Sequence, residues 1–143
     1  MSTASFEPAL TVEDANASLA KSMDRFACAD VEGLVSRYAD DISIRFAGLP
    51  EINGKQAAEN FLRSRFKIQG DYKVSKSLVA VAGQSYANTF TASWTDKTTG
   101  KQYEGRGVET IQLKDSKVTR WDCAYNLWEV GKQIEQSYFG QCL

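Results

Sequence analysis

Four long segments rich in β-forming residues fill the second half of this 143-residue chain and constrain its fold more than any other feature. They span residues 72–82, 84–96, 102–114 and 117–129. Only short stretches of turn-forming residues, such as Asp115-Ser116, separate them. Because connections this short join antiparallel neighbours, the segments predict a four-stranded antiparallel meander.

The first part of the chain has helical periodicity instead. Thr11 begins a Thr-x-x-Asp capping pattern, and an apolar stripe then recurs at steps of three and four over about 12–28. Asp30 is the predicted cap of a second, shorter helix, which we expect to end at Asp40-Asp41.

A period-two strand at 42–46 and a third helix over about 55–67 complete the predicted order. Helices gathered before a meander predict an α+β domain whose helices cover one face of an antiparallel sheet. A strongly curved sheet of this kind leaves a one-sided cavity suited to a small molecule. We expect residues 1–10 to form a flexible arm and residues 11–143 a single domain.

The chain contains no histidine, which excludes His-based triads, His-ligated zinc and the commonest general base near neutral pH. Its net charge of −1 disfavours a nucleic-acid partner, since such binders normally carry a basic excess. Any chemistry must therefore use carboxylates, Arg, Lys, Tyr, Ser, Thr or Cys. We expect no cofactor.

Three cysteines, Cys28, Cys123 and Cys142, are odd in number and irregularly spaced. This pattern predicts neither a disulfide framework nor a metal site. No charged segment followed by an apolar run opens the chain, and no apolar stretch approaches the ~20 residues of a membrane span. We therefore expect a cytoplasmic protein with no membrane partner.

Four sequence segments, at 38–42, 52–57, 105–109 and 114–122, carry a resemblance to a known superfamily. Over roughly residues 11–129 the chain resembles the nuclear-transport-factor-2-like superfamily, which includes SnoaL-like polyketide cyclases, ketosteroid isomerases and limonene epoxide hydrolases. The resemblance implies a cone-shaped, curved antiparallel sheet wrapped around N-terminal helices, also described as a cystatin-like α+β barrel. It also implies a homodimer and a ligand cavity between sheet and helices.

A narrower similarity is to a branch of this superfamily for which no activity is established. It rests on segments 61–66, 71–76, 94–96, 107–109 and 124–126. This similarity sharpens the expected fold and leaves the reaction open.

Glu109 is the first candidate for catalysis. It shares strand parity with Ile111 and Leu113, so alternation places it on their apolar face. A buried carboxylate must be paired or take up a proton. The resemblance implies that Glu109 is an acid/base carboxylate lining the pocket; the alternative is a solvated Glu, or one paired with Arg45 or Arg106.

Asp122 on the last predicted strand is the second catalytic candidate, because an acidic residue near this place is catalytic in SnoaL-like proteins. Parity places Asp122 on the outer face, where the superfamily commonly dimerises, and favours an interface or surface carboxylate beside Arg120. An inserted residue would reverse this assignment.

The remaining candidates are predicted to bind a ligand, with ordinary core packing as the alternative for each aromatic residue. Aromatic side chains on one face of two strands would form an apolar wall with polar tips. Tyr38, Tyr86 or Tyr125 could polarise a carbonyl, and a packed thiol is favoured over a nucleophile for Cys123. Parity places Arg45 at the surface unless its strand bulges. The set comprises Trp94, Phe90, Tyr86, Trp121, Cys123, Tyr125, Asn126, Arg45 and Tyr38.

Two departures narrow the chemistry that the resemblance implies. The Asp-Arg-Asp arrangement of the epoxide hydrolases is replaced by Gly107-Val108-Glu109 and Cys123, and the His of the cyclases is missing. We therefore predict an isomerase, cyclase or lyase that acts on a small hydrophobic, oxygenated metabolite through a carboxylate. The alternatives are a non-catalytic binding module and a dimeric interaction protein whose side chains fill the cavity.

Overall fold

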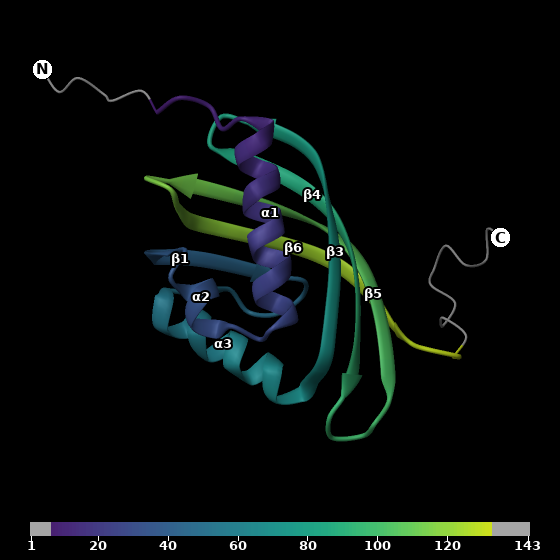
Figure 1. Ribbon diagram of the computed structural model, residues 1–143. Coiled ribbons are helices and arrows are strands. Elements are labelled where there is room, and N and C mark those ends of the chain that lie inside the picture. Colours follow the sequence, from purple (N-terminus) through teal and green to yellow (C-terminus); the bar gives the residue numbers. More distant parts are fainter. Residues whose placement is uncertain (1–6, 133–143) are drawn as a thin grey trace, which may run out of the picture.

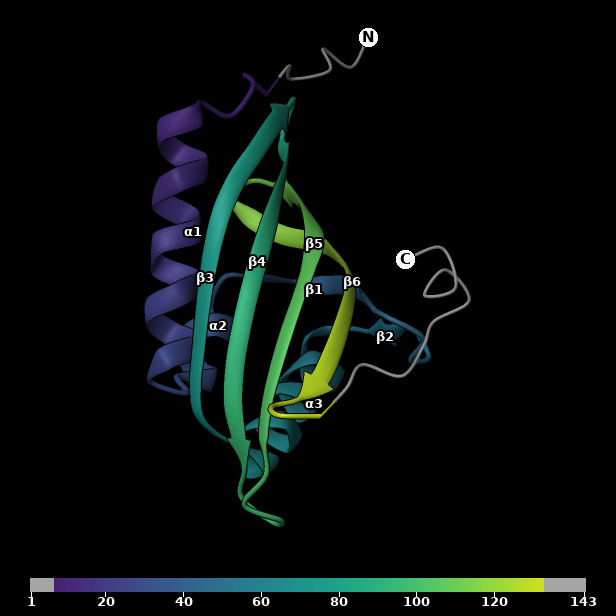
Figure 2. The same ribbon diagram turned by 90° about the vertical axis from the view of Figure 1, so that its right-hand side faces the viewer.

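The computed structural model describes residues 7–132 of the chain. In these residues three helices and six strands follow one another: α1 (Val12–Ala27), α2 (Val31–Val35), β1 (Tyr38–Phe46), β2 (Ile52–Asn53), α3 (Lys55–Ile68), β3 (Gln69–Ala82), β4 (Ser85–Asp96), β5 (Gln102–Lys114) and β6 (Lys117–Glu129). The strands form one sheet in the order β2-β1-β6-β5-β4-β3, and the helices lie on one face of it (Figures 1 and 2).

Strands β3 to β6 form the predicted antiparallel meander, and β3, β4 and β5 bend along their length (Figure 1). The sheet does not close on itself, because β2 and β3 are its two edges. Helix α1 packs along β3, and α3 packs against β1. The predicted α+β architecture, with helices against one face of a curved sheet, is confirmed.

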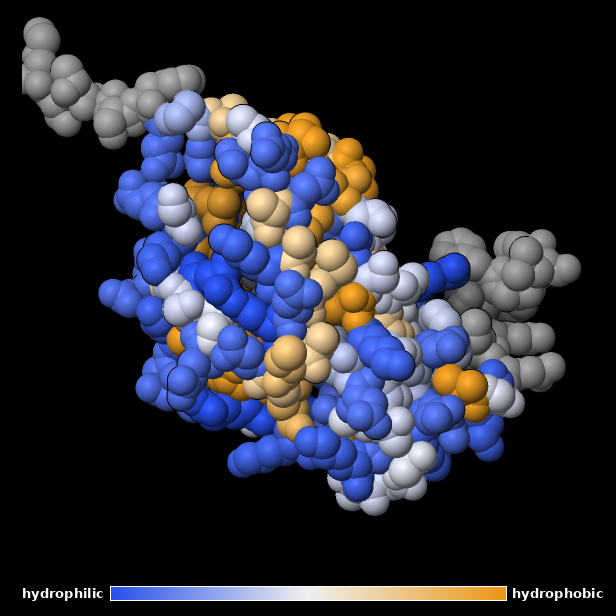
Figure 3. Space-filling view, viewed as in Figure 1, coloured by the Kyte–Doolittle hydropathy of each residue, from blue (hydrophilic) through white to orange (hydrophobic). Residues whose placement is uncertain are grey.

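Both predicted helix caps are confirmed. The Thr11 Oγ1 accepts a hydrogen bond from the Asp14 backbone N–H at 3.0 Å, and the Asp30 carboxylate accepts one from Gly33 N–H at 2.9 Å. The apolar stripe of α1 is turned toward the sheet. The side of the molecule that carries the helices, seen in Figure 3 from the viewpoint of Figure 1, is mostly hydrophilic, with hydrophobic residues in narrower patches.

The predicted end of the second helix at Asp40-Asp41 is wrong. Helix α2 ends at Val35, and both aspartates lie within β1. The chain joins the sheet earlier because the Arg37 carbonyl accepts a hydrogen bond from Val118 N–H of β6 at 2.8 Å. The pairing of β1 with β6 is parallel and irregular between Tyr38 and Ser43, which leaves the two aspartates at its irregular part.

One inserted residue in β6 decides which side chains enter the core. Leu113 pairs with Val118, whereas Gln112 pairs with Arg120, so Thr119 is extra. Val118 and Trp121 both face inward although they are three residues apart. Because the bulge precedes Trp121, alternation is regular beyond it.

Gly107 on β5 lies close to atoms of both neighbouring strands, β4 and β6. A Cβ atom there would lie 2.2 Å from the Ala124 carbonyl oxygen and 2.9 Å from the Phe90 ring. Only glycine fits such a space without a backbone shift. The glycine therefore permits the close packing of the sheet two residues before Glu109.

Candidate functional site

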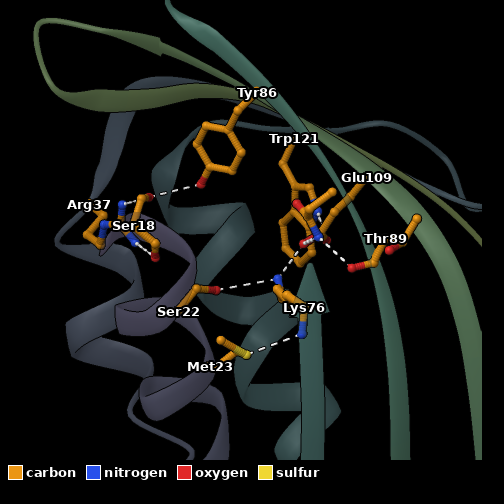
Figure 4. A network of polar contacts seen from close by, with 10 residues as sticks. Ser18, Ser22, Met23, Arg37, Lys76, Tyr86, Thr89, Glu109 and Trp121 are labelled. Atoms are coloured by element: carbon orange, nitrogen blue, oxygen red, sulfur yellow. Dashed lines mark hydrogen bonds and ion pairs between the residues drawn. The ribbon is translucent and has the colours of Figure 1, made fainter. Parts of the chain in front are cut away.

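Glu109 lies on the inner face of β5, and only 3% of its surface is exposed. Three donors from three strands surround its carboxylate, and Figure 4 labels two of them, Lys76 and Trp121. The Oε1 atom is paired with the Lys76 ammonium of β3 and accepts a hydrogen bond from Asn88 Nδ2 of β4 at 3.0 Å. The Oε2 atom accepts one from Trp121 Nε1 of β6 at 2.9 Å. Burial without loss of charge is possible because these donors replace water.

Lys76 is the main partner of Glu109, and its side chain is only 7% exposed. It extends from β3 toward α1, where its Nζ lies 3.5 Å from the Ser22 hydroxyl and 5.4 Å from the centroid of the Phe26 ring. Its backbone N–H points at the Met23 sulfur at 3.2 Å (Figure 4). The ion pair is therefore enclosed between α1 and the sheet.

Two small cavities lie beside this ion pair, and both are lined by Phe26, Lys76, Glu109 and Trp121. The first, here called the aromatic cavity, has a volume of about 60 Å³. Its wall also includes Arg65 and several aromatic rings: Phe46, Tyr72, Phe90, Trp94 and Tyr125. The second, here called the tyrosine cavity, has a volume of about 40 Å³ and is also lined by Arg37, Tyr38 and Tyr86.

Each cavity is smaller than the roughly 300–1,000 Å³ usual for drug-sized ligands. A few water molecules or the end of a small molecule fit without rearrangement. A larger ligand requires movement of the lining side chains.

A second cluster of polar side chains lies beside the tyrosine cavity and consists of Ser18, Arg37 and Tyr86. The Tyr86 hydroxyl lies 2.9 Å from the Ser18 hydroxyl, which also receives a hydrogen bond from Arg37 (Figure 4). Arg37 donates another to the Ser18 carbonyl at 3.2 Å. Burial raises the pKa of Tyr86, and it raises the pKa of Tyr38 far above its ordinary value. Both phenols are therefore neutral hydrogen-bond donors at physiological pH.

Most of the residues proposed from the sequence lie around these two cavities. Glu109 and Trp121 border both. Burial raises the pKa of Cys123 to about 12, so this thiol is protonated and a poor nucleophile near neutral pH. The aromatic cavity is bordered by Phe90, Trp94, Cys123 and Tyr125, and the tyrosine cavity by Tyr38 and Tyr86.

The structure places Asp122, Arg45 and Asn126 away from both cavities. The Asp122 carboxylate is 34% exposed and accepts a hydrogen bond from Arg120 Nε at 2.7 Å. Arg45 is exposed and lies 3.5 Å from Glu51. Asn126 is exposed and pairs in register with Arg106. The physical reason is strand parity. No bulge follows Trp121 in β6 to turn Asp122 and Asn126 inward, and Arg45 lies between Ile44 and Phe46, the core-facing residues of β1.

Sequence reasoning missed three polar residues of the site: Lys76, Asn88 and Arg65. Strand parity could have indicated the first two. Lys76 lies on the same face of β3 as Tyr72 and Val74, and Asn88 lies on the same face of β4 as Tyr86. A lysine or asparagine on the apolar face of a strand must find a partner there.

The described residues offer no evident place for a metal or a membrane span. Among residues 7–132, no three Cys, Asp or Glu side chains come together as metal ligands would. No helix in this part of the chain is long and apolar enough to cross a membrane.

Comparison with known proteins identifies the fold and the family of the chain. The fold is that of nuclear-transport-factor-2-like proteins, and one such protein of unknown function from an Exiguobacterium species is 20% identical, with a TM-score of 0.68 over 76% of this chain and 98% of its own. Residues 19–121 match the SnoaL-like domain, and the chain therefore belongs to that family.

Two further solved structures are similar. One is an LEH-like epoxide hydrolase from M. tuberculosis, 14% identical, with a TM-score of 0.66 over 77% of this chain and 80% of its own. The other is SalBIII, an epoxide hydrolase/cyclase-like enzyme with a role in pyran ring formation in the polyether salinomycin. It is 15% identical, with a TM-score of 0.72 over 82% of this chain and 96% of its own. At these identities the likeness shows the fold alone. No curated protein matches the chain significantly.

Proposed function

We propose that this protein is a cofactor-independent acid–base enzyme that moves a proton on a small, apolar, oxygenated molecule. The reaction class is isomerisation, cyclisation or elimination. The observation that supports the proposal most strongly is the buried Lys76–Glu109 pair, which borders both cavities. Charged groups enclosed beside apolar cavities are typical of sites that transfer protons.

Glu109 is the proposed base. Its Oε1 atom accepts from both Lys76 and Asn88, whereas among the described residues its Oε2 atom accepts only from Trp121. Since each carboxylate oxygen has two acceptor sites, Oε2 keeps one for a substrate proton. The three donors also hold the carboxylate in a single orientation, which positions it for the transfer.

Lys76 is the proposed electrophile. Its ammonium has three N–H donors, of which Glu109 and the more distant Ser22 account for two. The third can donate to a carbonyl oxygen that becomes an enolate oxygen as the proton passes from carbon to Glu109, or to an epoxide oxygen whose C–O bond breaks in that step. A positive charge already placed in a water-poor cavity stabilises such an oxygen more than solvent does. In the tyrosine cavity, Tyr38 or Tyr86 can donate in the same way.

The test begins with a turnover screen of small enones, cyclic ketones and epoxides with the wild-type protein. Glu109→Gln keeps the shape of the side chain and removes the base, so we expect turnover to fall about 10²- to 10⁴-fold with binding retained. Glu104→Gln is the matched control: Glu104 lies on the same strand, but it is exposed and bound to Trp128 at 3.2 Å. Equal turnover by Glu109→Gln and wild type would refute the assigned role.

One observation favours a second function, a binding or interaction protein without catalysis. The cavities are small, and the Glu109 carboxylate already has three partners within the protein, Lys76, Asn88 and Trp121. On this alternative the Lys76–Glu109 pair holds α1 against the sheet. A folded protein that turns over no member of the screen and whose Glu109→Gln variant loses only stability would support it. The homodimer, the cytoplasmic location and the absence of a cofactor stay predictions from the sequence.

A further inference from the structure

Arg65, in the last turn of α3, brings a second cation to the aromatic cavity. Its guanidinium carbon lies between 5.1 and 5.7 Å from the centroids of four aromatic rings, those of Phe26, Phe46, Phe61 and Tyr72. Its Nε donates to the Gln69 side-chain oxygen at 3.1 Å. None of the ion pairs among residues 7–132 includes Arg65.

The charges around the aromatic cavity do not balance. Its charged lining residues are Arg65, Lys76 and Glu109, and the last two form an ion pair with each other. Tyr72 and Cys123 are neutral, because burial raises the pKa of both. The cavity wall therefore carries one positive charge that no carboxylate of the described chain offsets. Aromatic rings hold this guanidinium in place, and Gln69 accepts from one of its five N–H donors.

The two cations are close enough to contact one small molecule. Arg65 Cζ and Lys76 Nζ each lie 5.4 Å from the centroid of the same ring, that of Phe26, so they are at most twice that distance apart. A molecule with an anionic group a few carbons from its reacting centre spans this distance. The aromatic wall between the cations suits an apolar body.

We infer that the substrate is a small apolar carboxylate whose anionic group pairs with Arg65 while its carbon skeleton extends toward the Lys76–Glu109 pair. The planar guanidinium matches the two oxygens of a carboxylate, and the small cavity favours this group over bulkier anions. This inference deepens the proposed function and rests on it for the reaction. The binding of the anion is independent of catalysis.

Paired probes test the charge preference directly. The wild-type protein is titrated with acetate, crotonate and benzoate, and separately with the matching amides, acetamide, crotonamide and benzamide. Binding is measured by the fluorescence of the cavity tryptophans and by NMR. We expect at least one acid to bind about tenfold or more tightly than its amide. The Arg65 Nε–H signal should shift with that acid and not with its amide.

Variants assign the preference to a residue. Arg65→Gln should abolish the preference for the acid, and Arg65→Lys should keep part of it. Arg63→Gln is the matched control on the same helix, since Arg63 is exposed and paired with Glu59, and it should bind as wild type does. No preference for any acid, an Arg65 signal that does not move, or an unchanged preference in Arg65→Gln would each overturn the inference.

The test of anion binding at Arg65 and the test of catalysis by Glu109 can fail independently of each other. Glu109→Gln removes a negative charge near the cavity, so it should bind the acid at least as tightly as wild type. If the acid binds at Arg65 but no compound is turned over, the anion site stands and the acid–base proposal fails. If turnover depends on Glu109 but acids and amides bind alike, the reverse holds.

Discussion

Removing the cation of the buried pair should destabilise the protein far more than removing a cation from a surface pair. Lys76→Met keeps the length and apolar stem of the side chain but leaves the Glu109 carboxylate facing only Asn88 and Trp121. The two side chains of the pair are 7% and 3% exposed, so bulk solvent cannot replace the missing charge. Breaking such a pair costs about 3–5 kcal/mol.

A surface pair on α3 sets the scale for comparison. Arg63 and Glu59 are four residues apart on α3, and their side chains are 47% and 29% exposed. Arg63→Met should therefore lower the free energy of unfolding by less than about 1 kcal/mol. Urea unfolding followed by tryptophan fluorescence and circular dichroism measures both variants under the same conditions.

A double substitution separates the loss of the pair from the loss of packing. In Lys76→Met/Glu109→Gln the unpaired charge is gone, so much of the stability lost in Lys76→Met should return. A loss below about 1 kcal/mol in Lys76→Met, or a double variant less stable than the two single losses added together, would refute the claim that these residues form a desolvated ion pair.

Three further predictions concern backbone packing, the accessibility of the cysteines and the titration of Cys123. Gly107→Ala should lower the free energy of unfolding by about 1–3 kcal/mol, because its Cβ would meet the Ala124 carbonyl, whereas Gly48→Ala, with nothing within 4 Å, should change it little; equal losses would contradict the close approach. In the native protein, iodoacetamide should label Cys28 and spare Cys123, as peptide mapping can show. Because the folded pKa of Cys123 is raised from 9 to about 12, its contribution to stability is complete below pH 9 and is lost between pH 9 and 12, and Cys123→Ala should flatten that part of the pH profile.

Local periodicity was sufficient to predict most of the elements. The apolar stripe and its cap defined α1, and segments rich in β-forming residues separated by short turns defined the meander, because both patterns depend only on neighbours in the sequence. The second helix was predicted to be too long because the burial of Tyr38 is compatible with a helix as well as with β1. What decides between the two is the hydrogen bond from Val118 to the Arg37 carbonyl, which joins residues distant in the sequence.

The burial of Glu109 followed from parity, but its partner did not. Parity indicates which face a side chain occupies and not which strand lies opposite it. Lys76 reaches Glu109 across β4, which lies between β3 and β5 in the sheet, and the curvature of the sheet brings the two together. Arg65 was harder still to predict. It lies on α3 close to Arg63 and Lys67, and basic residues gathered on a helix usually form a solvated face. Only the aromatic rings from α1, β1 and β3 distinguish Arg65 from its neighbours.

The central claim is that the buried Glu109 transfers protons. Its most direct test is whether the reacting carbon of the substrate exchanges its proton with the solvent. A compound identified in the turnover screen is incubated with the protein in D₂O, and deuterium at its reacting carbon is measured by NMR. Wild type and Glu104→Gln should incorporate deuterium at the same rate, and Glu109→Gln should incorporate it at least about a hundredfold more slowly. Incorporation by Glu109→Gln at the wild-type rate would show that another group moves the proton.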